Sequence, residues 1–234
     1  MEQCRVGDWH LALARGYTKR ANSACILPLG NGAGDRAAQI QSVEEICNLY
    51  RVRSVVPTFR ITPLAAEFRI DDYLNSQNFI GFDKTFVQFL DLSQARLSAD
   101  PSVVVVDKAD FAWRTNLARE QGLDDESSAA QGLIFDRIGG VTLYASLIDQ
   151  GTPVAWGMAV VQDGLVGIFN VITNPSQRGR GFAGRLTQTL LASGYQNGAT
   201  GAYLQVGTDN KAALVVYARL GFVERYSYHY RRPA

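Results

Sequence analysis

Residues 174–184 read Asn174-Pro-Ser-Gln-Arg178-Gly-Arg-Gly181-Phe-Ala183-Gly184 and join a predicted strand to a predicted helix. At a helix start the first backbone N–H groups have no partner within the helix, and the helix dipole is positive there. Glycine lets those amides come close to a ligand, so the junction predicts an anion site. Arg178 and Arg180 add positive charge that suits a pyrophosphate. We therefore expect a phosphate-bearing cofactor.

The same glycines also satisfy a second pattern. Gly179, Gly181 and Gly184 match the dinucleotide-binding spacing G-x-G-x-x-G. The preceding strand comes from a hairpin, however, and the next predicted strand, 203–206, is followed by Gly207 rather than by an acidic residue that would hold a ribose. A nucleotide-dependent oxidoreductase is therefore only the third hypothesis.

On both sides of this junction, the sequence of the second half of the chain predicts a mixture of helices and strands. Asp163-Gly164 has the preferred chemistry of a two-residue hairpin turn. Strands are predicted at 103–106, 141–148, 154–161, 165–173, 203–206 and 222–230, and helices at 111–121, 126–138, 182–195 and 211–220. This order predicts a mixed α/β layer fold.

The first half predicts a smaller α/β part. Ser42 and Glu45 form a capping box that predicts a helix from there to about Tyr50. Strands are predicted at 9–14, 24–29, 59–62 and 85–92, a short helix at 71–77, and a glycine-rich loop at 30–34. The polar, proline-containing stretch 93–101 predicts a domain boundary, with an N-terminal part at 1–95 and a second domain at 96–234.

A downstream segment makes the anion site more specific. Asn210-x-x-Ala213-x-x-Val216-Tyr217-x-x-x-Gly221-Phe222 resembles the N-x-x-A-x-x-L-Y-x-x-x-G-F segment of GNAT N-acetyltransferases. Arg178-x-x-Gly181-x-Ala183 resembles their R/Q-x-x-G-x-G/A signature. Both motifs stand in the family's order, and the resemblance covers about residues 102–230, strictly 165–223. It implies the GNAT acyltransferase fold, in which helices flank a central mixed, largely antiparallel sheet.

The resemblance also implies acetyl-CoA as co-substrate and no metal. Residues 171–173 would end the central strand where the chains splay, and free backbone groups would pair there with pantetheine. The amides of 178–184 would hold the pyrophosphate, and Asn210 would touch the pantetheine arm. The implied cofactor-binding residues are Val171, Ile172, Thr173, Arg178, Gly179, Arg180, Gly181, Phe182, Ala183, Gly184, Asn210, Ala213 and Tyr217.

The implied chemistry is direct attack of a primary amine on the thioester. An N–H of Ile172 or Thr173 would stabilise the oxyanion. Tyr217 would protonate the leaving thiolate as a general acid, an effect worth ~10²–10⁴ in rate. The predicted strand 167–173 has no carboxylate where many relatives carry one. Proton removal then passes through water or through a carboxylate from elsewhere, such as Asp136.

The N-terminal part carries a further resemblance. Tyr17-Thr-Lys-Arg-Ala-Asn-Ser23 is similar to a segment that precedes the acetyltransferase core in some two-part members. The strand–loop–helix that ends at Tyr50 resembles the one that ends at Tyr217. We therefore predict a degenerate half of the same fold, whose role is to wall the acceptor site.

Several of these residues also have a purely structural interpretation. Asn210 is a natural N-cap for the helix that follows it. Tyr226, Tyr228 and Tyr230 alternate as residues that pack on a sheet do. Arg178 and Arg180 can form a solvated basic turn, and His229 is a structural residue or a base.

Composition limits the remaining classes. The 23 basic and 22 acidic residues nearly cancel, which argues against a protein that coats nucleic acid. Cys4, Cys25 and Cys47 have no metal-ligand spacing, and no His or Cys stands near His10 or His229 in sequence, so no zinc site is expected. The chain lacks a signal peptide and a long apolar run, so we expect no membrane span and a cytoplasmic location.

The sequence leaves the acceptor open. We expect a small-molecule or peptide amine, and the oligomeric state is not predicted. The missing strand carboxylate and the large N-terminal part keep a second hypothesis, a non-catalytic acyl-CoA-binding or sensor module. Amine acetylation with a broad panel of amines separates the two hypotheses.

Overall fold

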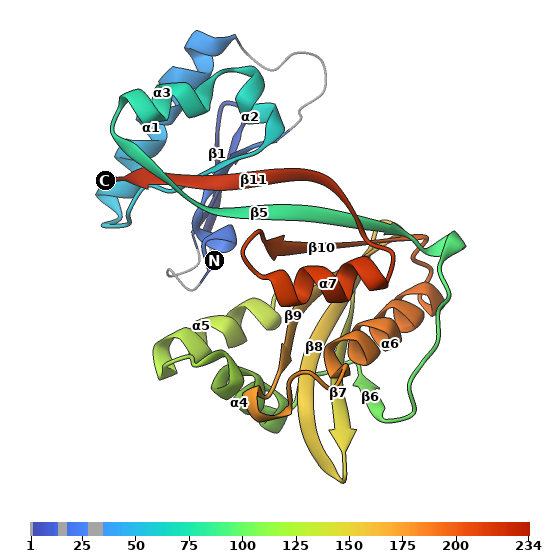
Figure 1. The fold of residues 1–234 in the computed structure, drawn as a ribbon. Helices are drawn as coiled ribbons and strands as arrows, with labels where there is room; N and C mark the ends of the chain where they lie inside the picture. Colours follow the sequence, from blue (N-terminus) through green and yellow to red (C-terminus); the bar gives the residue numbers. More distant parts are fainter. Residues whose placement is uncertain (1, 14–17, 28–34) are drawn as a thin grey trace. The chain divides into compact units, whose positions relative to one another are not determined.

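The computed structural model describes residues 2–13, 18–27 and 35–234. The chain forms two compact units, Met1–Phe86 with Tyr226–Ala234, and Val87–Arg225 (Figure 1). The units divide inside two strands, β5 (Phe79–Asp91) and β11 (Val223–Pro233). A continuous strand leaves no change of composition at the point of division, so these points could not be found in the sequence.

The first unit packs helices on a sheet. Its strands follow the order β1-β2-β3-β4-β11-β5, and β3 and β4 are parallel. Trp9, Ile46 and Phe59 are completely buried at the centre of its core. The strands are β1 (Glu2–Val6), β2 (Trp9–Leu13), β3 (Ala24–Ile26) and β4 (Phe59–Ile61), and the helices are η1 (Arg20–Asn22), α1 (Arg36–Val52), α2 (Pro63–Glu67) and α3 (Ile70–Ser76).

The predicted capping box at Ser42 is wrong. Helix α1 begins at Arg36, where the Asp35 side chain accepts from the Ala38 N–H at 2.9 Å. Ser42 lies inside the helix, and its hydroxyl donates to the Ala38 carbonyl at 3.0 Å, the back-bond that serine makes within helices. A carboxylate N-cap therefore starts the helix earlier than the serine signal.

Other differences in this unit concern short elements. Strand β1 and helix α2 were not predicted, and β5 begins at Phe79 rather than at residue 85. The predicted loop at 30–34, the last residue of the strand predicted at 9–14, and the start of the 17–23 segment lie outside the described residues.

The second unit contains the predicted mixed sheet. The order of its strands is β5-β10-β9-β8-β7-β6. Neighbours from β6 to β9 are antiparallel, whereas β9 and β10 are parallel. Asp163 and Gly164 adopt φ of +50° and +74°, as a two-residue hairpin requires. The strands are β6 (Val103–Val106), β7 (Val141–Asp149), β8 (Thr152–Gln162), β9 (Leu165–Thr173) and β10 (Gly201–Gly207).

Helices cover both faces of this sheet, so the predicted fold class is confirmed. Helices α4 (Phe111–Gln121) and α5 (Asp125–Phe135) pack on one face, where Trp113 and Phe135 contact Trp156 and Met158 of β8. Helix α6 (Phe182–Gln196) covers the other face (Figure 1). The short helices η2 (Leu92–Gln94) and η3 (Pro175–Gln177) and helix α7 (Lys211–Arg219) complete the unit.

Candidate active site

Strand β9 contains a bulge at Asn170. Trp156 of β8 pairs with Ile172 but Met158 pairs with Phe169, so β9 has one extra residue opposite Gly157. Asn170 takes up the extra length with φ of +53°. The bulge interrupts the alternation of side chains, and Phe169 and Ile172 therefore both pack on the α4–α5 face. The sequence reading missed this bulge, although asparagine is among the residues that tolerate the left-handed region.

Beyond the bulge, β9 separates from β10. Their register ends where Leu204 pairs with Ile168, although β9 continues to Thr173 and β10 to Gly207. The Asn174 N–H donates to the Val154 carbonyl at 2.9 Å. Because antiparallel residues alternate in direction, the backbone groups of Thr173 point away from β8. The strands thus splay where the sequence predicted it.

The side chain of Thr173 adds a second observation at this splay. Its Oγ1 is buried and has no hydrogen-bond partner within the part of the chain that the structure describes. Leaving a buried hydroxyl unpaired costs about 1–3 kcal/mol. A polar ligand that lies along the strand end would remove that cost.

The glycine-rich loop that follows leads into α6 without a side-chain cap. Gly179 and Gly181 both adopt φ of +78°, and Gly181 is the N-cap of α6. A Cβ at either glycine would meet no protein atom within 4 Å, so the space above both backbones is open. The first N–H groups of α6 are therefore available to an anion, as predicted from the junction.

The two loop arginines differ in their partners. Arg178 is exposed, its Nε donates to the Thr173 carbonyl at 3.3 Å, and within the described ranges it makes no ion pair. Arg180 is paired with Asp149 at 2.8 Å, and its guanidinium lies 4.6 Å from the centre of the Phe182 ring. Arg178 is thus the arginine whose charge is available to a ligand.

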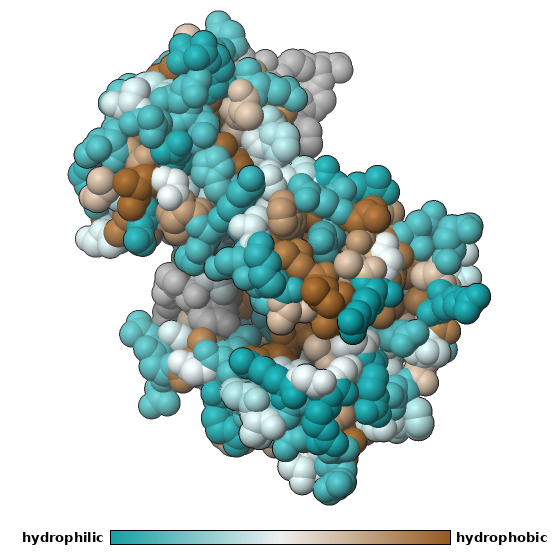
Figure 2. Space-filling view, viewed as in Figure 1, coloured by the Kyte–Doolittle hydropathy of each residue, from teal (hydrophilic) through white to brown (hydrophobic). Residues whose placement is uncertain are grey.

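Helix α7 lies beside the start of α6. A Cβ at Gly184 would lie 3.8 Å from Val216, an ordinary van der Waals contact. Asn210 accepts from the Ala213 N–H at 3.1 Å, which confirms its role as N-cap. Every residue of α7 is at least partly exposed, Tyr217 is half-buried, and Val215 is 51% exposed. Figure 2 shows hydrophobic side chains over this helix. An apolar helix left this open indicates a surface that binds another molecule.

Tyr217 stands at the end of α7. Its ring packs edge to face against Phe222, with 5.9 Å between the ring centres. Burial raises the pKa of Tyr217 to about 12. Its hydroxyl has no hydrogen-bond partner among the described residues, so it is free to donate to a ligand atom.

Two carboxylates near the α4–α5 face differ in exposure. Asp136 is 58% exposed and paired with Arg114 at 2.6 Å, and this contact holds the pKa of its carboxyl below the usual range. Glu120 is only 6% exposed, although it lies in the last turn of α4. Its carboxylate accepts from Asn174 Nδ2 at 3.3 Å, directly after β9. The sequence reading missed Glu120, because its position depends on the packing of α4 against β9.

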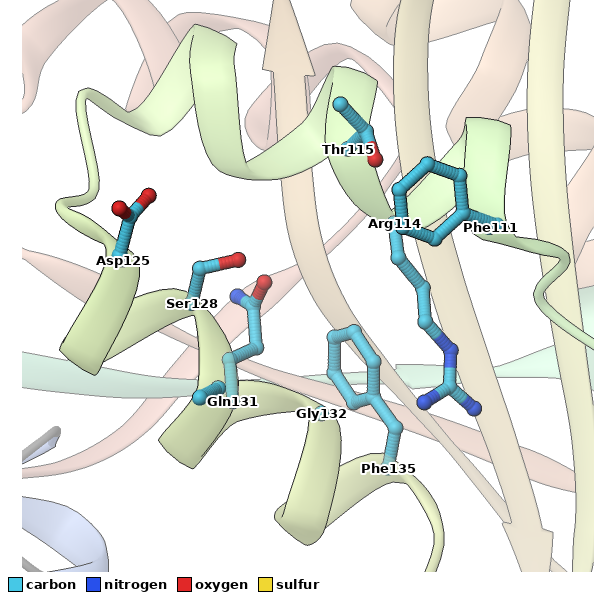
Figure 3. A pocket seen from close by; sticks show the side chains of 9 residues that line it. Phe111, Arg114, Thr115, Asp125, Ser128, Gln131, Gly132 and Phe135 are labelled. Atoms are coloured by element: carbon cyan, nitrogen blue, oxygen red, sulfur yellow. The ribbon is translucent and has the colours of Figure 1, made fainter.

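A chain of amides lies close to this carboxylate. Gln121 donates to Asn170 Oδ1 at 3.5 Å and accepts from Gln131 at 2.7 Å. Gln131, which is 2% exposed, also lines a cavity of about 300 Å³ between α4 and α5, where Figure 3 shows the Phe111 and Phe135 rings and the Arg114 guanidinium. The wall of this cavity is therefore connected by hydrogen bonds to the bulge of β9.

The other candidate residues from the sequence have structural partners. Tyr228 and Tyr230 are 3% and 4% exposed and pack edge to face, which favours the sheet-packing interpretation. His229 Nε2 lies 2.8 Å from Asp71. In the 17–23 segment that resembles part of two-part members, Asn22 is 8% exposed and its Nδ2 donates to the Thr18 carbonyl at 2.7 Å.

The described residues contain neither a metal-binding cluster nor a helix that could span a membrane. No three His, Cys, Asp or Glu side chains among them are grouped so that they could hold a metal ion. None of the helices described is both long and apolar enough to cross a membrane.

Known proteins resemble the whole chain. The family described as "Probable histone acetyltransferase Rv0428c C-terminal" matches residues 1–231. The uncharacterized N-acetyltransferase YobR of Bacillus subtilis is 26% identical and covers 98% of this chain and 91% of its own length. A GCN5-related N-acetyltransferase from Kribbella flavida superposes with a TM-score of 0.73 at 15% identity, covering 99% of this chain and 89% of its own. A second, from Sphaerobacter thermophilus, gives 0.68 at 16% identity, covering 96% and 76%.

The family match spans both units, so the N-terminal part is as much a member of the family as the part that carries the glycine-rich loop. The structural neighbours have the same fold at low identity. This chain therefore belongs to the family described as probable histone acetyltransferase Rv0428c C-terminal, and it is an acyltransferase of the GNAT superfamily.

Proposed function

We propose that the chain transfers an acetyl group from acetyl-CoA to a primary amine. The observation that carries this proposal is the splay of β9 from β10, with the unpaired Thr173 hydroxyl at its edge and the open glycine-rich loop directly after it. An extended polar arm followed by a diphosphate matches these two features in that order. Acetyl-CoA contains both the polar arm and the diphosphate, and it also carries an activated acyl group.

The residues present fit both the pyrophosphate and the pantetheine arm of the cofactor. The free N–H groups at the start of α6 and the unpaired charge of Arg178 suit the pyrophosphate. The Thr173 carbonyl points away from β8 and has room beside Arg178 Nε to accept from an amide of the pantetheine arm, which would pair as an added strand. The remaining residues assigned to the cofactor are Val171, Ile172, Gly179, Arg180, Gly181, Phe182, Ala183, Gly184, Asn210, Ala213 and Tyr217.

The strand end favours one donor for the developing oxyanion. The backbone of Ile172 is directed toward its partner Trp156 on β8, whereas the Thr173 N–H points to the splayed side. Of these two N–H groups, that of Thr173 is therefore the better candidate to stabilise negative charge on the carbonyl oxygen.

Tyr217 fits the general acid. Because burial raises its pKa to about 12, the hydroxyl is protonated throughout the neutral range. It has no competing acceptor among the described residues, so its proton is free for the thiolate. Tyr217→Phe should lower kcat by ~10²-fold or more while acetyl-CoA affinity stays within about twofold. An unchanged kcat would remove Tyr217 from this role.

Calorimetry tests the donor side. Wild-type protein should bind acetyl-CoA, and Arg178→Glu should abolish binding, because it places a negative charge beside the pyrophosphate. Arg219→Glu is the matched control, since Arg219 is also an exposed arginine but lies in the last turn of α7. Absence of acetyl-CoA binding by the wild type would overturn the proposal.

A second function, a non-catalytic acyl-CoA sensor, is favoured by the lack of a carboxylate on β9. A turnover assay separates the two functions. The panel of acceptors should contain small alkylamines and lysine-rich peptides, because the family description names a histone acetyltransferase. Tight acetyl-CoA binding without acetylation of any amine would establish the sensor.

A further inference from the structure

The last turn of α4 lies over the splayed end of β9. Two consecutive side chains make the contact: Glu120 accepts from Asn174, and Gln121 donates to Asn170. These partners stand immediately before and after residues 171–173, the segment at which the pantetheine arm is proposed to pair. Glu120 therefore faces the strand end on the side of the sheet that α4 and α5 cover.

The orientation of Asn174 is fixed by its other contacts. Its Oδ1 accepts from the backbone N–H of Ser176 at 3.0 Å and from the Ser176 hydroxyl at 2.7 Å. Its Nδ2 is therefore the group that points to Glu120. A carboxylate held by an amide at 3.3 Å keeps most of its capacity to accept further hydrogen bonds.

The charge of Glu120 is only partly balanced within the fold. Its one cationic partner among the described residues, Arg119, lies 3.3 Å away with a side chain that is 63% exposed, so water weakens this pair. A carboxylate that is only 6% exposed needs a partner that shares its environment. The neighbouring amides of Gln121 and Asn170 carry no charge that would repel a cation.

We infer that Glu120 binds the ammonium group of the acceptor and accepts the proton that this group must lose. The inference rests on the proposed function. Asp136, Asp149 and Asp100 are less suitable for this role, because each of them is paired with an arginine that lies 2.6–2.8 Å away.

The proton and the electron pairs balance without another reactant. The ammonium gives one proton to the Glu120 carboxylate, and the nitrogen lone pair then forms the bond to the thioester carbon. The carbon–sulfur bond breaks, and the sulfur leaves with its electron pair and receives the Tyr217 proton. The second proton of the new amide nitrogen leaves to solvent, and solvent also restores both side chains.

Glu120→Gln is the direct test, because glutamine keeps an oxygen that can accept from Asn174 but removes the charge. With the best primary amine among the alkylamines and peptides, kcat/KM at pH 7 should fall about 100-fold or more. The loss should become smaller at high pH, where the amine is already neutral and needs no proton acceptor. Acetyl-CoA affinity should stay within about twofold. Glu126→Gln, the same change at an exposed glutamate in the first turn of α5, is the control and should retain wild-type kcat/KM.

The outcomes are distinguishable. An E120Q variant with the wild-type rate would overturn the inference, as would a loss of rate that stays equally large at a pH where the amine is already neutral. Loss of acetyl-CoA binding in a folded E120Q protein would overturn it too, because Glu120 would then act on the donor side. Failure of the wild type to bind acetyl-CoA would overturn the proposed function itself.

Discussion

The bulge at Asn170 predicts that a glycine at this strand position is more stable than an alanine, the reverse of the usual order. At an ordinary strand position glycine is less stable than alanine by about 0.5–1 kcal/mol. Asn170, however, has φ of +53°, which costs an alanine about 1–2 kcal/mol. Glycine adopts this angle freely, and it loses only about 0.4–1 kcal/mol through the entropy of the unfolded chain. We therefore expect Asn170→Gly to be more stable than Asn170→Ala by about 0.5–1 kcal/mol.

Both variants also lose the amide contacts of Asn170. The contacts to Gln121 and to the Met158 sulfur are each 3.5 Å long, so their loss should cost only about 0.5 kcal/mol, the low end for a hydrogen bond. Asn170→Ala should thus lose about 1.5–2.5 kcal/mol in total. Because both variants share this term, it cancels in their difference and leaves the backbone effect alone.

Urea unfolding followed by tryptophan fluorescence measures the difference directly, since Trp113 and Trp156 both belong to the cluster against which Phe169 and Ile172 pack. Acetylation rates of both variants show whether the bulge also positions the strand end. An alanine variant as stable as the glycine variant, or more stable, would refute the left-handed backbone at residue 170 and the register shift it supports.

Three further predictions concern the elements that hold the site. Gly194→Ala should lower the free energy of unfolding by about 1–3 kcal/mol, because its Cβ would lie 2.7 Å from a Val166 side chain that is fully buried. At Gly132, another helical glycine, the nearest atom would lie 3.6 Å from the new Cβ, so Gly132→Ala should raise the free energy of unfolding by about 0.5–1 kcal/mol in the same urea assay. Asp100→Asn removes the negative charge and one of the two oxygens that accept from Arg185 of α6, and it should cost about 0.5–1 kcal/mol at pH 7. The hydrogen bond from Arg185 lowers the pKa of the Asp100 carboxyl in the folded state, so this stability is present above the ordinary value of 3.8 and is lost as the pH falls below it. The difference between wild type and variant should therefore shrink in acid, and a difference independent of pH would contradict the ion pair.

The elements around the predicted cofactor site could be predicted because their signals are local. The bounds of β9 and α4 agree with the sequence, since the Asp163-Gly164 turn fixes the start of β9 and the Asp110 side chain caps α4. The glycine-rich loop lies between β9 and α6 as the sequence predicts, with the short helix η3 at its start. Each of these features depends on a few neighbouring residues.

Features that depend on tertiary packing were missed or left undecided. Arg178 and Arg180 look alike in the sequence, and only the position of Asp149 on β7 shows that one of them is already paired. Glu120 looks like any charged residue near a helix end. Its burial follows from the contact of α4 with β9, and no periodicity in α4 indicates that contact.

The predicted half-repeat can be compared through topology. In the first unit β3 and β4 are parallel, with α1 between them in sequence, and in the second β9 and β10 are parallel, with α6 between them. The strand–helix–strand around α1 therefore corresponds to that around α6, whereas the sequence compared it with the segment ending in Tyr217. In this correspondence the loop before α1 falls at residues outside the described ranges. The half-repeat stays a prediction. In it, α1 of the first unit corresponds to α6, the helix that begins at the predicted anion site.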